Sequence, residues 1–340
     1  AKEIETHPLT LGNGTLGQAG ITTPATVKTD VNCGQAFGEF FPFDFGPGEL
    51  PDDQRHDDAL SATFDTSPLD QDMPLIGAPR VHLGVAADTE FAQMAVRLCD
   101  VAPDGASTLI SLGILNLQFR DTFEQAKPLV PGQVYVVTLD LDQAAYVVPG
   151  GHRIRLAISP AYWPFVWPER GETMLSIHQG TLEIPVFQDA GGLDWDCPSP
   201  PKSPRSTAKS VPSGVEEKRS FVEDGQLKLI IHADHGVDVH PDHGLQTASE
   251  IHETWAIDQS DISKATADIV WKRSVGRDDF SAATEIVTKM HSDSDAYHVT
   301  LGIRAYDGET CVFEHEFTDS FWRDLTRDGQ PTDKNVGRQK

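Results

Sequence analysis

The sequence predicts an all-β protein, and three observations support this. The 340 residues include 28 Gly and 23 Pro, which is typical of a chain with many turns. Few stretches keep the 3.6-residue period of a helix for more than two turns. Apolar and polar residues instead alternate in short runs, as in VYVVTLDLD (134–142) and HRIRLAIS (152–159). These runs predict antiparallel sheets with one face in a core.

Residues 1–58 are predicted to be a lead-in that packs on the following domain. LTLGNGTLG (9–17) favours a hairpin around Asn13-Gly14. Residues 37–58 are first aromatic, then rich in Pro and Gly, then acidic. We expect a long ordered loop there, because four phenylalanines in this stretch need burial. These are Phe40, Phe41, Phe43 and Phe45.

Residues 59–188 are the most regular block. Turn signals such as Pro131-Gly132, Gly150-Gly151 and Gln179-Gly180 separate its apolar runs. Strands are predicted over 59–66, 79–88, 90–101, 107–119, 132–142, 152–159, 173–178 and 181–188. This number and spacing of strands predicts a jelly-roll β-sandwich.

Residues 189–216 are rich in Pro, Ser, Gly and Lys and are predicted to be a linker or loop. Residues 217–325 return to strand patterns and are predicted to form an antiparallel β-rich extension, a meander with one face in water. Its strands are predicted over 226–234, 250–258, 265–276, 283–291, 297–308 and 310–320. Residues 326–340 are expected to be a frayed tail.

Charge and cysteine content limit the partners and the compartment. The net charge is −25, from 52 acidic and 27 basic residues, which argues against nucleic acid and anionic membranes as partners. Cys33, Cys99, Cys197 and Cys311 are far apart and form no CxxC pair, so we expect reduced thiols in a cytoplasmic protein. No signal peptide is recognised at Ala1, and the missing methionine suggests a fragment or a processed product.

A serine nucleophile and a catalytic histidine are both doubtful from the sequence. No Gly-x-Ser-x-Gly turn occurs, and Gly105-Ala106-Ser107 lies in a predicted hairpin. His152 follows Gly150-Gly151 beside two arginines and could serve as a base near an anion site. The alternation of apolar residues after it favours a second interpretation, in which His152 is the entry of a half-buried strand.

Histidines gather in HADHGVDVHPDHG (232–244), where imidazoles and carboxylates together could hold a divalent metal. The weak metal candidates are His232, His235, His240 and His243. The alternative is a polar hairpin without metal. His252-Glu253 begins like HExxH, but Ala256 stands where the second histidine would be. The sequence therefore predicts no metal and no cofactor.

Two further segments have both a structural and a functional interpretation. PAYWPFVWP (160–168) could pack internally, dock another domain or contact a ligand through its aromatic residues. Those residues are Tyr162, Trp163, Phe165 and Trp167. The acidic run PDDQRHDD (51–58) could gather calcium, but it lacks EF-hand spacing and Arg55 can pair with a neighbouring aspartate. We interpret it as a structural loop.

Four ordered motifs resemble one protein family. They are DQRHDDALSATFDTSPL, PLIGAPRVHL, RLCDVAPDG, and PGQVYVVTLDL leading to PGGHRIRLAIS. They are similar to the C-terminal domain of X-Pro dipeptidyl-peptidases and cocaine-esterase-like (CocE/NonD) hydrolases, over about residues 35–188. Residues 217–325 resemble more loosely the β-rich extension of some bacterial members.

The resemblance implies a galactose-binding-like jelly roll packed on an α/β-hydrolase domain that carries a Ser-Asp-His triad. No residue of this chain matches a triad position, so we expect no catalytic residue in it. We therefore expect the non-catalytic C-terminal part of a serine hydrolase, which supports the catalytic domain, lines its cleft or mediates homo-oligomerisation. The alternatives are a carbohydrate- or small-ligand-binding module, and a free-standing metalloenzyme built on the histidine cluster.

Overall fold

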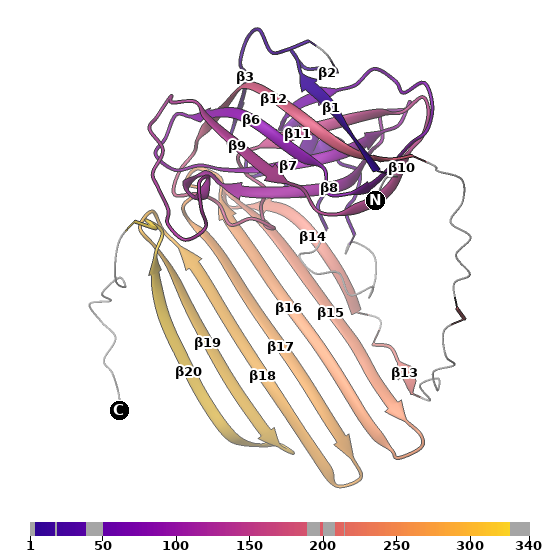
Figure 1. Cartoon of the computed structure of the whole chain (residues 1–340). Coiled ribbons are helices and arrows are strands. Elements are labelled where there is room, and N and C mark those ends of the chain that lie inside the picture. The colour runs from indigo at the N-terminus through magenta and orange to yellow at the C-terminus, as the bar shows by residue number, and fades with distance from the viewer. Residues whose placement is uncertain are drawn as a thin grey trace. The chain divides into compact units, whose positions relative to one another are not determined.

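The computed structural model describes residues 4–17, 19–38, 50–188, 198–199, 208–213 and 215–326. Over these residues the protein is all-β, as predicted, and every ladder between its strands is antiparallel (Figure 1). The chain divides into an N-terminal unit (1–193) and a C-terminal unit (194–340). Three predictions concern residues outside the described ranges. They are the burial of Phe40, Phe41, Phe43 and Phe45, the tail after 326, and most of the 189–216 linker, of which only 198–199, 208–213 and 215–216 are described.

The N-terminal unit contains two sheets. The larger is built around a long central strand, β12, and comprises β1 (Ile4–Leu11), β2 (Leu16–Gly17), β3 (Ala25–Lys28), β5 (Met73–Gly77), β6 (Arg80–Ala87), β9 (Tyr135–Asp140), β10 (Ala144–Val148) and β12 (Met174–Phe187). The smaller has the order β4-β11-β7-β8 and comprises β4 (Ala62–Asp65), β7 (Gln93–Val101), β8 (Ser107–Asn116) and β11 (Arg153–Ser159).

The core of the N-terminal unit lies between these two sheets. Leu98 and Leu156 from the smaller sheet and Leu83 and Ile184 from the larger one belong to one buried apolar cluster. Alternation along β11 buries Ile154, Leu156 and Ile158, as the sequence predicted. Fully burying an aliphatic side chain of this size stabilises the fold by about 1.5–3 kcal/mol.

One prediction in this unit was wrong at Gln179-Gly180. The sequence predicted two strands there, over 173–178 and 181–188, but β12 runs through both, with a bulge between Ile177 and Gln179. A Cβ on Gly180 would lie 2.8 Å from Leu83 Cδ2 and 2.9 Å from Leu11 Cδ2. The glycine is therefore needed for close packing on both neighbouring strands, and it does not mark a turn.

The hairpin predicted around Asn13-Gly14 is confirmed, with Gly14 at φ 73° between β1 and β2. The short strands β5 and β10 were not predicted. In the described part of the chain no helix is long and apolar enough to cross a membrane.

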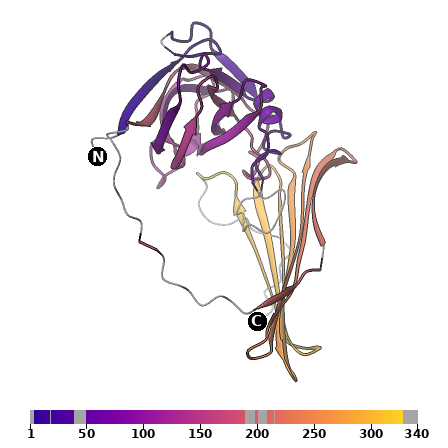
Figure 2. The same cartoon turned by 90° about the vertical axis from the view of Figure 1, so that its right-hand side faces the viewer.

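The C-terminal unit is an eight-stranded antiparallel sheet in which β15 to β20 follow one another as a meander, as predicted. Figure 2 shows this sheet nearly edge-on as a single twisted layer. Its strands are β13 (Lys209–Val211), β14 (Val215–Glu223), β15 (Gln226–His240), β16 (Leu245–Asp258), β17 (Ala265–Arg277), β18 (Phe280–Ser292), β19 (Ala296–Asp307) and β20 (Thr310–Trp322).

The two faces of this sheet differ in chemistry, because side chains alternate along every strand. One face carries charges in register across the strands, with Lys272 Nζ 3.3 Å from Glu250 and Arg304 bridging Glu285 (3.2 Å) and Glu314 (2.7 Å). The predicted wet face is thus confirmed. The opposite face is called the apolar face and includes Ile251, Ile269, Trp271, Ile286, Leu301, Ile303, Phe313, Phe317 and Phe321.

Candidate functional site

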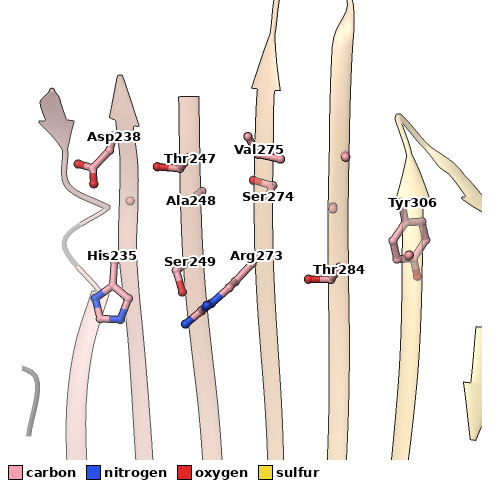
Figure 3. A pocket seen from close by; sticks show the side chains of 14 residues that line it. His235, Asp238, Thr247, Ala248, Ser249, Arg273, Ser274, Val275, Thr284 and Tyr306 are labelled. Carbon is pink, nitrogen blue, oxygen red and sulfur yellow. The ribbon is translucent and has the colours of Figure 1, made fainter. Parts of the chain in front are cut away.

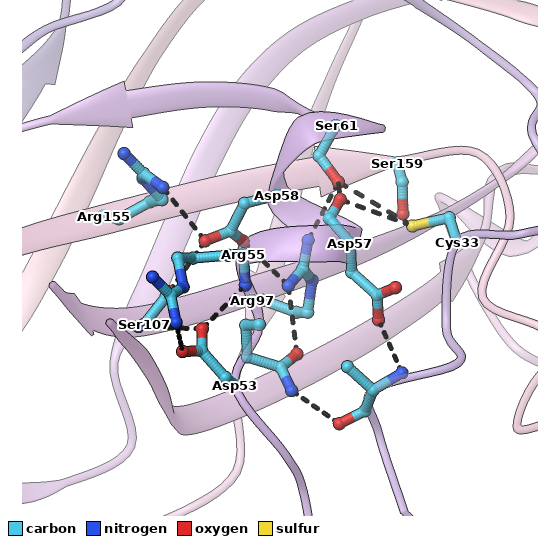
Figure 4. Close-up of polar contacts among 12 residues, drawn as sticks. Cys33, Asp53, Arg55, Asp57, Asp58, Ser61, Arg97, Ser107, Arg155 and Ser159 are labelled. Carbon is cyan, nitrogen blue, oxygen red and sulfur yellow. Dashed lines mark hydrogen bonds and ion pairs between the residues drawn. The ribbon is translucent and has the colours of Figure 1, made fainter. Parts of the chain in front are cut away.

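The N-terminal unit contains a network of buried charges (Figure 4). It begins at α1 (Arg55–Ala59), a short helix in the acidic segment that was predicted to be a loop. That expectation was wrong at this point. Asp57 and Asp58 are buried, whereas Arg55 lies outside and pairs with Asp53 at 2.6 Å, the internal pair that the sequence suggested.

Asp58 is the centre of the network. Its carboxylate lies 2.8 Å from Arg97 Nη1 and 3.0 Å from Arg155 Nη1, and Ser107 Oγ donates to it at 2.7 Å. Arg155 also donates twice to Asp65, at 2.7 Å from Nε and from Nη2. The two arginines come from the paired strands β7 and β11, so the network ties α1 to the smaller sheet.

Arg97 is fully buried, and two neutral groups accept further hydrogen bonds from it. Nη1 donates to Gln54 Oε1 at 3.0 Å, and Nη2 donates to Ser61 Oγ at 2.9 Å. Tyr162 Oη donates to the same Gln54 oxygen at 3.2 Å. A buried guanidinium with this many partners is held in one position, which suits a structural brace.

The two thiols near this network are buried and poorly acidic. Burial raises the pKa of Cys33 to about 11 and that of Cys99 to about 12, although Arg97 acts in the opposite direction on both. A thiol reacts as the thiolate, which neither cysteine forms near neutral pH.

Burial also raises the pKa of Asp57, with Arg97 only partly offsetting it. A folded-state pKa above the unfolded value stabilises the fold below the ordinary carboxyl pKa, and this contribution is lost as the pH rises through the folded pKa. We expect Asp57→Asn to remove that loss. Its stability relative to the parent should rise with pH from about 4 to 7, measured as the urea midpoint at each pH. A difference that does not change with pH would contradict this origin.

The predicted aromatic contacts at 160–168 divide into two groups. Tyr162 and Trp163 are each 1% exposed, so neither is available to a ligand or a docked domain at the surface of this structure. Phe165 and Trp167 are half-buried. Phe37, which lies outside the loop, packs against two of these rings. Its ring centroid is 4.0 Å from that of Phe165 and 5.6 Å from that of Tyr162.

Tyr162 and Trp163 are thus packed inside the N-terminal unit. The sequence could not foresee this, because the covering residue Phe37 lies far away along the chain.

His152 immediately precedes β11, close to the strand entry that the sequence suggested. Its Nδ1 lies 2.8 Å from Asp100 Oδ1, and Tyr146 Oη donates to the other oxygen of Asp100 at 2.9 Å. Burial and this bond to Asp100 raise the pKa of Tyr146 to about 12. Among the described residues no hydroxyl or thiol hydrogen-bonds to His152, so the pair lacks a nucleophile.

A Ser-His-Asp chain that the sequence did not reveal occurs in the C-terminal unit. His298 Nδ1 lies 2.9 Å from Ser320 Oγ, and its Nε2 lies 3.3 Å from Asp293 Oδ2. In a catalytic triad the aspartate holds Nδ1 and the nucleophile meets Nε2, the reverse of this arrangement. Ser320 is also only 6% exposed and lies within β20 rather than on a strained turn. We interpret it as a structural contact.

The four predicted histidines do not converge. His232 Nε2 lies 3.1 Å from Glu250 Oε1, whereas His240 stacks on His243 with ring centroids 5.3 Å apart. His235 lines a separate hollow. Within the described ranges no three His, Cys, Asp or Glu side chains are placed to hold a metal ion.

That hollow has a volume of about 530 Å³ and lies on the meander (Figure 3). Its lining includes Ala248, Ser274 and Ala283, which occupy paired positions on β16, β17 and β18. Arg273 lies in it with its guanidinium 4.4 Å from the ring centroid of Trp271. The lining includes no arrangement of nucleophile, base and oxyanion donors.

The described residues thus form β-structured units, and the buried polar groups of the N-terminal unit pair with one another. The sequence comparison identifies the family of this unit. The family model described as the X-Pro dipeptidyl-peptidase C-terminal non-catalytic domain matches residues 3–196, and the chain belongs to this family. The resemblance seen in the sequence motifs is thereby confirmed.

Named relatives match parts of the chain. The cocaine esterase of Rhodococcus sp. (strain MB1 Bresler) is 26% identical over 121 residues, which cover 36% of this chain and 21% of the esterase. The Xaa-Pro dipeptidyl-peptidase of Lacticaseibacillus casei (strain BL23) is 29% identical over 129 residues, covering 28% of this chain and 16% of that protein. The matched region is thus well under a third of either relative.

Two solved structures match about half of the chain. An aminopeptidase from a marine sediment archaeon, Thaumarchaeota archaeon, gives a TM-score of 0.48 at 21% identity, covering 54% of this chain and 37% of that one. An α-amino acid ester hydrolase gives 0.47 at 23% identity, covering 53% of this chain and 36% of that one.

Proposed function

We propose that this chain is the non-catalytic C-terminal part of a serine hydrolase that cleaves esters or amides, and that it supports an α/β-hydrolase catalytic domain. The observation that carries the proposal is the match of residues 3–196 to a family defined as non-catalytic. The absence of a Gly-x-Ser-x-Gly turn from the whole sequence supports it. A jelly-roll strand order in the N-terminal unit is part of the same proposal.

The chemistry of acyl transfer supports the assignment. It requires an accessible nucleophile, a base in hydrogen-bond reach and preorganised donors for the oxyanion. His152 has an orienting carboxylate but no nucleophile, and Ser320 has a histidine but is buried. Neither arrangement in the described residues brings the three requirements together.

The N-terminal unit offers a surface for the catalytic domain in a segment other than the aromatic loop. Its most exposed large apolar side chains are Phe123 and Val136, and Val130 and Val134 are also exposed. All four lie between residues 123 and 136. Apolar side chains concentrated at a surface are typical of contact sites, so we propose that this segment contacts the catalytic domain.

The purified chain should not react with a fluorophosphonate probe and should not hydrolyse p-nitrophenyl acetate or an X-Pro p-nitroanilide above the rate in buffer. The physical reason is the absence of an activated serine. The measurement is labelling by intact mass together with release of nitrophenol or nitroaniline. The cocaine esterase of Rhodococcus is the positive control for labelling and ester cleavage. Stoichiometric labelling of any serine would overturn the proposal.

A further inference from the structure

The last strand of the C-terminal unit, β20, lies at an edge of its sheet. β20 is 13 residues long, and in the described part of the chain it pairs only with β19. Residues 310–322 contain no proline, glycine or lysine, and the single bulge in the β19–β20 ladder lies near the first residues of β20. Native edges are usually blunted by such residues, because the outward N–H and C=O groups of alternate residues can pair with another chain.

The side chains of this edge follow a regular pattern. Phe313, Phe317 and Phe321 lie on the apolar face and are 54%, 51% and 47% exposed. His315 and Asp319 alternate with them on the same face. The opposite face of β20 carries Glu314, Glu316, Thr318 and Ser320.

We propose that β20 pairs antiparallel with β20 of a second copy, around a twofold axis at Phe317. The strand is self-complementary about this residue. Phe317 then faces Phe317 of the second copy, and the other opposed pairs, each occurring twice, are Phe313 with Phe321, His315 with Asp319, Glu314 with Ser320, and Glu316 with Thr318.

Each pair in this register is favourable or neutral. Opposed aromatic side chains and opposed groups of opposite charge stabilise antiparallel strands, whereas like charges directly opposite destabilise them. On the apolar face the register gives three aromatic pairs with a histidine–aspartate pair on either side of the axis. On the other face each glutamate meets a hydroxyl group.

The neighbouring registers that keep the faces matched are worse. An axis at His315 places Glu314 opposite Glu316 twice. An axis at Glu316 opposes the two copies of Glu316 and places Phe313 against Asp319. An axis at Thr318 places Phe317 against Asp319.

A second copy therefore fits this edge better than an unrelated strand. The sequence pattern that complements β20 is the pattern of β20 itself. The axis is perpendicular to the sheet, so the apolar faces of the two copies join into one surface. This pairing does not depend on the proposed catalytic partner.

The test is the mass of the full 340-residue chain in solution, measured by sedimentation velocity over a concentration series with reductant present. We expect a concentration-dependent dimer. Phe317→Lys places two ammonium groups on the axis and should raise the dissociation constant by about tenfold or more. The matched control is Phe280→Lys, because Phe280 is 53% exposed at the start of β18 and away from β20. The control should dimerise as the parent does.

Charge exchange tests the register. His315→Asp opposes two carboxylates on each side of the axis and should weaken the dimer. The double variant His315→Asp/Asp319→His restores an aspartate–histidine pair and should recover it. A chain that stays monomeric at about 100 μM, above the micromolar constants of weak specific contacts, overturns the proposal, as does a dimer equally sensitive to both lysine variants or a double variant without recovery. Circular dichroism establishes that each variant is folded.

The native thiol gives an independent check. In this register Cys311 lies opposite Arg323 of the second copy, 12 positions from the other Cys311, or about 40 Å along the strand. The non-covalent dimer should therefore persist in Cys311→Ser. A dimer that disappears with this substitution would be a disulfide product and would contradict strand pairing.

Discussion

Asp58→Asn is expected to lower the free energy of unfolding of the N-terminal unit by about 3–5 kcal/mol. The substitution conserves volume but leaves Arg97, which has no solvent contact, without the carboxylate at 2.8 Å. Arg155 keeps Asp65, so the loss falls mainly on Arg97. The measurement is urea unfolding of the full chain, with hydrogen exchange of β7 and β11 peptides assigning the transition to this unit.

Asp53→Asn provides the control for that experiment. Asp53 belongs to the same acidic run, but its partner Arg55 is exposed and the pair is in water. Exposed ion pairs contribute little to stability, so this variant should unfold close to the parent. An equal loss in both variants would mean that the charge of the segment, rather than the buried pair, sets the stability.

Gly34→Ala is the second substitution with a large expected effect, about 3 kcal/mol of destabilisation. Gly34 has φ +112°, and a Cβ there would lie 2.6 Å from the carbonyl oxygen of Trp163 and from the carbonyl carbon of Tyr162. Those atoms are backbone and cannot rotate away. The variant therefore displaces the 160–168 loop from the backbone at residue 34. This exposes tryptophan side chains to water and should shift tryptophan fluorescence to longer wavelength.

Gly14→Ala separates the clash from the backbone cost. Gly14 also has positive φ, +73°, but no atom lies within 4 Å of the point that its Cβ would occupy. It should lose only about 1 kcal/mol, the cost of a left-handed conformation. The difference between the two melting temperatures measures the contact with residues 162 and 163, and equal losses would show that this contact is unimportant.

The sequence predicted those elements whose signal is local. Alternation along β11 follows from burial of one face, whereas alternation along the meander strands separates a charged face from an apolar one, and the structure confirms both alternations. Gly180 misled the prediction because a glycine required for close packing has the same sequence signal as a turn glycine. Helix α1 was missed because its carboxylates are held by Arg97 and Arg155, which lie 39 and 97 positions beyond Asp58.

The candidate site was less predictable because its contacts join residues that are far apart in the sequence. Burial of Tyr162 and Trp163 depends on the distant residues Gly34 and Phe37, and no local pattern announces either contact. His298, Ser320 and Asp293 meet only through the register of β19 and β20. The self-complementary pattern of β20, in contrast, can be read from the sequence once the edge position is known.

The two units should differ in how fast they form. Every ladder from β15 to β20 joins strands adjacent in sequence, whereas β1 pairs with β12, bringing Ile4 opposite Phe187. Folding rates fall as the sequence separation of contacts grows. The meander can therefore form one hairpin at a time as it leaves the ribosome. The larger sheet of the N-terminal unit cannot form completely until β12 has been synthesised.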